Sequence, residues 1–227
     1  MTRHQWSVRY SEAGALVSWI GVGLEFFITV ERVLAQGRHF QEALVLFFSF
    51  FTILTNILVA CAFTAVVLQH VKHSEGLQKT GAWNFLARPF ILGGIAPSIA
   101  LVGIVYNLVL RQLWHPTGWA RVADELLHVV VPIGFVIYWC LFVPKTGLRW
   151  RDCLTWAIYP ILYLVYALVH GALSGVYAYP FIDVATLGYG AVLMNSVGIL
   201  IGFLAMALTF IAFDRRKSVA SSEDGMG

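Results

Sequence analysis

The sequence predicts an all-α polytopic membrane protein, with six transmembrane helices in one bundle and both termini in the cytoplasm. Three observations support this: the composition, the length of the apolar runs and the placement of the basic residues. The chain has 227 residues, of which 59% are hydrophobic and 12% are charged, whereas soluble domains carry about 25% charged residues. A chain with so little charge needs lipid as the solvent for most of its surface.

Six apolar runs are each long enough for the ~20-residue helix that crosses a bilayer core. Pro89 suits the first turn of the third helix, and Pro97 and Pro160 are expected to kink the helices that contain them. The predicted spans are Ala13–Val33, Ala43–His70, Pro89–Arg111, Glu125–Val143, Cys153–Tyr177 and Gly188–Phe213. Residues 1–213 are therefore expected to form one transmembrane domain, and the polar residues 214–227 a disordered cytoplasmic tail.

The orientation follows from the distribution of lysine and arginine, because basic loops are retained on the cytoplasmic side. Most of these residues lie in the two termini and in the second and fourth loops: Arg3, Arg9, Lys72, Lys79, Arg88, Lys145, Arg149, Arg151, Arg215, Arg216 and Lys217. The other three loops hold Arg32, Arg38, Arg111 and Arg121. Both termini are therefore predicted to be cytoplasmic.

The same composition argues against several classes of function. The net charge is only +3, and no basic run with interleaved polar surface is present, so nucleic acid is not an expected partner. The three cysteines show no C-x-x-C spacing, so neither a disulfide framework nor a metal site is expected. The expected partners are membrane lipids, no cofactor is implied, and the residues do not specify an oligomeric state.

Polar side chains inside the predicted spans are the candidates for function. A charge at the bilayer centre costs ~2.5–3.5 kcal/mol on insertion scales, so such residues face the bundle interior. The candidates are Glu25 in the first span, Thr52, Thr55 and Asn56 in the second, His128 in the fourth and His170 in the fifth. From the topology, Thr52 should lie about 13 Å deep and His128 within about one turn of the outer surface.

These residue types suggest nucleophilic chemistry. A hydroxyl needs a base to become a nucleophile, and a neutral imidazole is the usual base. Thr52 and His128 could form such a pair, with Asn56 or His170 polarising an acyl oxygen. Each residue also has a structural interpretation: a membrane threonine can bond to the carbonyl one turn earlier, and His170 can bond across helices.

Three segments resemble a known family. FFTILTNIL (Phe50–Leu58), HVVVP (His128–Pro132) and HGALSGVYAYPF (His170–Phe181) are similar to segments of the Pr6Pr membrane protein family. That family includes bacterial proteins and is similar to the eukaryotic androgen-induced, FAR-17a-like proteins. The resemblance extends from the second span to the loop after the fifth.

The resemblance implies a threonine hydrolase that cleaves fatty acid esters of hydroxy fatty acids. It implies that Thr52 is the nucleophile and His128 its partner, in a multi-pass protein of a bacterial inner membrane. The resemblance gives His170 a secondary role, whereas Thr55 and Asn56 depart from the family pattern. The candidate supporting or substrate-binding residues are Asn56, His170, Thr55, Glu25 and Tyr179. Thr55, one turn from Thr52, is a rival nucleophile.

Two other functions are compatible with the same residues. His128 and His170 could be axial ligands of a haem in a redox protein. Glu25 could relay a proton in a transporter, or the protein could be a non-catalytic scaffold. The absence of an inverted repeat in the sequence argues against transport.

Overall fold

The chain folds into long helices that run side by side. The computed structural model describes residues 2–74 and 81–223. In this part of the chain six helical segments are long and apolar enough to cross a membrane. They are α1 (Arg3–Ala35), α3 (Phe51–Ser74), α5 (Pro89–Val105) with η1 (Tyr106–Leu110), α6 (Gly118–Glu125) with η2 (Leu126–Val130) and α7 (Val131–Phe142), α8 (Asp152–Ser174) and α9 (Val184–Glu223). The predicted all-α fold with six spans is confirmed, and the protein is a multi-pass membrane protein.

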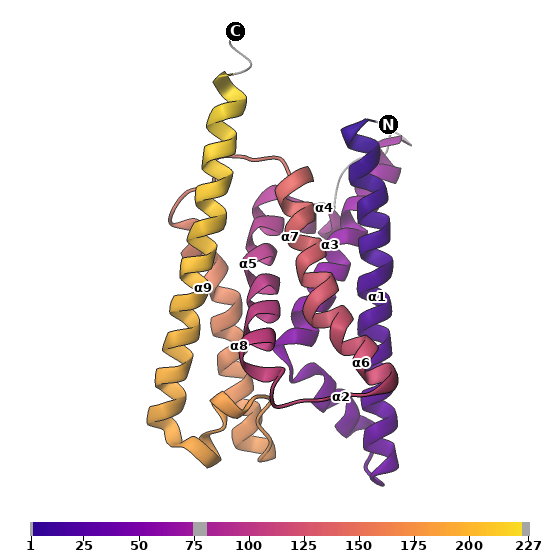
Figure 1. Ribbon diagram of the computed structural model, residues 1–227, viewed down its shortest axis with the longest axis vertical. Helices are drawn as coiled ribbons and strands as arrows, with labels where there is room; N and C mark the ends of the chain where they lie inside the picture. The colour runs from indigo at the N-terminus through magenta and orange to yellow at the C-terminus, as the bar shows by residue number, and fades with distance from the viewer. Residues whose placement is uncertain (1, 75–80, 224–227) are drawn as a thin grey trace.

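The spans form a single bundle, in which α1 begins and α9 ends at the same end (Figure 1). We call the opposite end, where α1 ends and α9 begins, the distal end. The short helix α2 (Phe40–Phe48) lies there, and the single turn η3 (Pro180–Ile182) precedes α9, whereas α4 (Ala82–Leu86) leads into α5. Helix α1 packs against α3 and the fourth span, while α5 contacts α3, α7 and α9.

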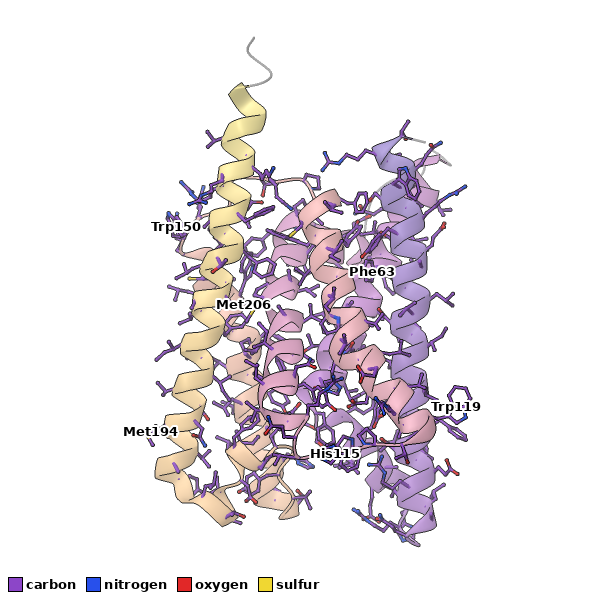
Figure 2. All side chains as sticks on the ribbon, viewed as in Figure 1. Phe63, His115, Trp119, Trp150, Met194 and Met206 are labelled. Atoms are coloured by element: carbon purple, nitrogen blue, oxygen red, sulfur yellow. The ribbon has the colours of Figure 1, made fainter. Side chains whose placement is uncertain are left out.

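Aromatic side chains fill the interior between the helices. Phe63, Phe135 and Trp139 are almost completely buried, and Phe63 points into the bundle in Figure 2. Trp119 and Met194 are each 72% exposed and point outward in the same view. Because lipid is as apolar as the interior, close packing rather than burial from water holds such helices together.

The second predicted span is broken, and this corrects the expectation of one helix over Ala43–His70. Helix α2 ends at Phe48, and α3 begins at Phe51. The hydroxyl of Tyr163 donates to the Ser49 carbonyl at 2.8 Å, and that of Tyr166 donates to the Phe48 carbonyl at 3.3 Å. These bonds satisfy carbonyls that a continuous helix would have paired internally, so the chain can break its helix inside the bundle.

Other boundaries also differ from the prediction, and the first span begins at Arg3 rather than Ala13. The fourth span begins at Gly118 rather than Glu125, so His128 lies ten residues (128 − 118) from its start, about 15 Å along the axis. The expected start of this span is therefore corrected, whereas the depth of His128 below the membrane surface stays a prediction. The last helix continues past Phe213 to Glu223, so the start of the expected tail is helical, and residues 224–227 lie outside the described residues.

Candidate functional site

A cavity of about 390 Å³ is lined by the last part of α1, the first turn of α3 and the segments that precede and follow them in the bundle near the distal end. We call it the distal chamber. Its walls come from α1, α3, η1, the fourth span and the segment before η3. The polar and charged side chains that line it are Glu25, Thr29, Arg32, Thr52, Tyr106, Asp124, His128 and Tyr179. The chamber thus brings together Thr52, His128, Glu25 and Tyr179 of the predicted residues.

Two π-helical turns form one wall of the chamber. Tyr106 begins η1, and His128 lies in the middle of η2. Their rings stack with centroids 3.7 Å apart and planes inclined by 16°. Such turns insert an extra residue into a helix, and they occur frequently at functional sites. Here they present two ring side chains to each other across neighbouring spans.

Asp124 holds the imidazole of His128 in a defined orientation. Its Oδ1 lies 3.1 Å from His128 Nδ1, and its backbone carbonyl lies 3.0 Å from the same nitrogen. Both neighbours of Nδ1 are acceptors, so Nδ1 carries the proton of the neutral ring. Nε2 is then the nitrogen with a free lone pair, which is the form that a general base requires.

Tyr106 completes this arrangement. Its hydroxyl donates to Asp124 Oδ2 at 2.5 Å, while its ring lies against the imidazole. The Asp124 side chain is only 9% exposed, and a buried carboxylate needs such partners. Neither Asp124 nor Tyr106 was among the residues predicted from the sequence, although the four-residue spacing between Asp124 and His128 is a signal that could have identified the pair.

Thr52 occupies the first turn of α3, at the break in the second span. Its Oγ1 lies 3.3 Å from the hydroxyl oxygen of Tyr179, and its backbone N–H donates to that oxygen at 3.2 Å. The first N–H groups of a helix have no partner within it. The break therefore places the Thr52 hydroxyl beside a helix N-terminus, on the wall of the chamber.

Thr55 has a different environment from Thr52. It is fully buried, donates its hydroxyl to the Phe51 carbonyl at 2.7 Å and lies 3.0 Å from the Tyr159 hydroxyl. It does not line the distal chamber. This is the structural arrangement expected of a membrane threonine, so of the two threonines Thr52 is the one with a hydroxyl at the chamber.

Asn56 connects the two candidate catalytic segments. Its amide nitrogen donates to the Thr52 carbonyl at 2.8 Å and to the Leu127 carbonyl at 3.1 Å. Both N–H groups are thereby used within the protein. The expectation that Asn56 polarises an acyl oxygen is not met; instead it fixes the start of α3 against the residue that precedes His128.

His170 is not brought to the chamber. It lies near the end of α8, with its ring 6.0 Å from that of Tyr166, and it is absent from the chamber lining. Its buried Nε2 has no hydrogen-bond partner among the described residues. The predicted role of His170 in polarising a substrate held at Thr52 and His128 therefore has no support in this arrangement.

A second cavity, of about 100 Å³, adjoins the chamber. Both are lined by Thr52, Tyr106, Leu110 and Tyr179. The rest of the second cavity is largely apolar and is formed by side chains of α5, α8 and α9 together with Phe181 and Ile182. Thr52 thus lies between the distal chamber, which holds the charged side chains, and an apolar cavity.

The fold and the site define a class: a six-span membrane protein with a threonine, a histidine and an aspartate on one intramembrane chamber. No family model, curated protein or solved structure matches the chain.

Proposed function

We propose that the protein is an integral membrane hydrolase of lipid-like esters, such as fatty acid esters of hydroxy fatty acids, in a bacterial inner membrane. Thr52 is the nucleophile and His128 the general base. The observation that carries this proposal is the shared chamber of Thr52 and an imidazole whose Nδ1 is held by Asp124. A nucleophile, a base and a group that orients the base are the recurring parts of acyl-transfer sites.

The proposed reaction has two stages. His128 Nε2 accepts the hydroxyl proton as Thr52 Oγ1 attacks the ester carbonyl carbon, and the same proton then passes to the departing alkoxide. This gives an alcohol and an acyl group esterified to Thr52. In the second stage His128 removes a proton from water, the hydroxide attacks the acyl group, and Thr52 regains its proton as the fatty acid leaves.

Tyr179 takes the supporting role that the sequence suggested for Asn56 or His170. Its hydroxyl oxygen accepts the Thr52 N–H and lies 3.3 Å from Thr52 Oγ1, so in the proposed reaction its proton turns from the threonine oxygen to the negatively charged oxygen. Burial raises the pKa of Tyr179, which keeps the phenol protonated and able to donate. A donor already in place where charge develops is an effective way to stabilise a tetrahedral intermediate.

The apolar cavity beside Thr52 supports a substrate with a hydrocarbon chain. It adjoins the chamber at Thr52, Tyr106 and Tyr179, so a chain lying there would have its ester group beside the nucleophile. Ligand sites combine apolar walls with a few polar groups that fix orientation. The two adjoining cavities have this composition.

The test is hydrolysis of a branched fatty acid ester by detergent-purified protein. We expect turnover by the wild type and by Thr55→Ala, and its loss in Thr52→Ala and His128→Ala. Turnover that survives in Thr52→Ala would overturn the assignment of the nucleophile. No turnover with several lipid esters would favour the transport or scaffold functions, and an absorbance scan of the same sample in the Soret region tests the haem alternative.

A further inference from the structure

Arg32 lines the distal chamber beyond the catalytic residues. It lies on α1 seven residues (32 − 25) after Glu25, which is about two turns or ~10 Å farther toward the distal end. Its guanidinium carbon lies 5.5 Å from the centre of the Trp114 ring. Trp114 lines the same chamber, so the tryptophan holds the arginine at the chamber wall by a cation–π contact.

Among the described residues, Arg32 forms no ion pair within 4.0 Å, and the nearest electrostatic partner that is identified for it is the more distant carboxyl group of Glu25. Arg38 pairs with Glu42, and Arg111 pairs with Glu125. The Trp114 ring lies 5.5 Å from the guanidinium carbon, and the planar fork of donors of an arginine suits an oxyanion.

We propose that Arg32, supported by Trp114, binds a singly charged anionic group of the substrate. This inference rests on the proposed function and deepens it, because it assigns a specificity-determining residue to the same chamber. The chamber also holds the carboxyl groups of Glu25 and Asp124, which disfavour a doubly charged ligand. A carboxylate and a phosphodiester share the required chemistry.

The placement predicts how a substrate lies. Its anionic group contacts Arg32 near the distal end, its ester group lies at Thr52, and a hydrocarbon chain enters the apolar cavity. A neutral ester of the same length loses the contact with Arg32. The protein should therefore prefer amphiphilic esters that carry an anionic group separated from the scissile bond.

Binding and turnover test this separately. Tritiated oleate would be bound to Thr52→Ala protein in detergent, with unlabelled oleate, methyl oleate and phosphatidylglycerol as competitors. We expect at least one of the two anions to compete better than methyl oleate. We also expect Arg32→Gln to weaken oleate binding roughly tenfold, because the variant loses a hydrogen bond to a charged group. Stronger competition by phosphatidylglycerol than by oleate would identify a lipid headgroup as the source of the anion.

Arg38→Gln is the matched control, because Arg38 is an arginine of the same distal end that pairs with Glu42 and does not line the chamber. If Arg32→Gln binds oleate as tightly as the parent, or if Arg38→Gln has the same effect, the inference is overturned. Turnover is read in the protein with Thr52 intact: Arg32→Gln should raise KM for the carboxylated ester more than for its methyl ester. If the protein binds oleate through Arg32 but hydrolyses no ester, the proposed anion site stands and only the proposed hydrolase function is refuted.

Discussion

The imidazole of His128 lies flat against the phenol ring of Tyr106, with centroids 3.7 Å apart. The Tyr106 hydroxyl donates to the carboxylate that also contacts His128 Nδ1. Tyr106 therefore acts on His128 in two ways, through its ring and through Asp124. The two contributions can be separated by substitution.

Tyr106→Phe keeps the ring and removes the hydroxyl. We expect kcat/KM for ester hydrolysis to fall roughly tenfold, because a hydrogen bond to a charged group contributes ~1.5–3 kcal/mol and part of its loss will be compensated. Tyr106→Leu also removes the stacked ring and should lower kcat/KM further. Equal activities of the two variants would show that the stacking does not position His128.

Asp124→Asn tests whether the carboxylate sets the tautomer of His128. An amide of the same shape can present an N–H to Nδ1 and so place the imidazole proton on Nε2, which removes the base. We expect kcat to fall roughly a hundredfold or more, with a smaller change in KM. Glu125→Gln is the control, since Glu125 pairs with Arg111 and does not line the chamber; a similar loss in this control would contradict a specific role for Asp124.

Asn56→Ala tests the connection between α3 and η2. The variant loses the two hydrogen bonds to the Thr52 and Leu127 carbonyls, and we expect the free energy of unfolding to fall by about 1–3 kcal/mol. Because these bonds also fix Thr52 relative to His128, kcat should fall in protein that remains folded. A lower melting temperature with an unchanged kcat would limit Asn56 to a structural role.

The environment of Lys145, in the loop after α7, predicts that the stability of the protein depends on pH. Its Nζ lies 3.7 Å from the centre of the Trp139 ring and donates to the Val143 carbonyl at 3.0 Å. Burial lowers the pKa of Lys145 to about 8, against the opposing effects of Cys140 and Asp214. Between about pH 8 and the unfolded pKa near 10.4, the unfolded chain binds the extra proton, so this contribution to stability rises with pH.

The measurement is the thermal unfolding midpoint in detergent from pH 7.5 to 10, for wild type and Lys145→Met. Other groups also titrate in this range, so the difference between the two proteins isolates the lysine. We expect the wild type to gain stability relative to Lys145→Met as the pH rises. A difference that stays constant across the range would refute a lowered pKa.

The spans could be predicted from the sequence because apolar runs of this length have few alternatives in a membrane. Thr52 and His128 could also be identified from the sequence, because they are polar residues within those apolar runs. Asp124 was missed because the predicted start at Glu125 placed it in a loop, whereas the helix begins at Gly118. Tyr106 was missed because a tyrosine in an apolar run does not differ in sequence from a packing residue.

The break at Ser49 could not be predicted for a physical reason. No proline or glycine lies at Ser49 or Phe50, and the carbonyls freed there are paired by Tyr163 and Tyr166, more than a hundred residues later in the chain. The break depends on contacts between distant segments. The π-helical turns at Tyr106 and His128 were likewise not predicted from the local sequence.

Covalent labelling of Thr52 tests the central claim most directly. A long-chain alkyl fluorophosphonate phosphonylates an activated hydroxyl and expels fluoride, and mass spectrometry of the digested protein locates the adduct. The account predicts an adduct on Thr52 that is absent from Thr52→Ala, strongly reduced in His128→Ala and retained in Thr55→Ala. An adduct on Thr55 or on any other residue, or no adduct in active wild-type protein, would contradict Thr52 as the nucleophile.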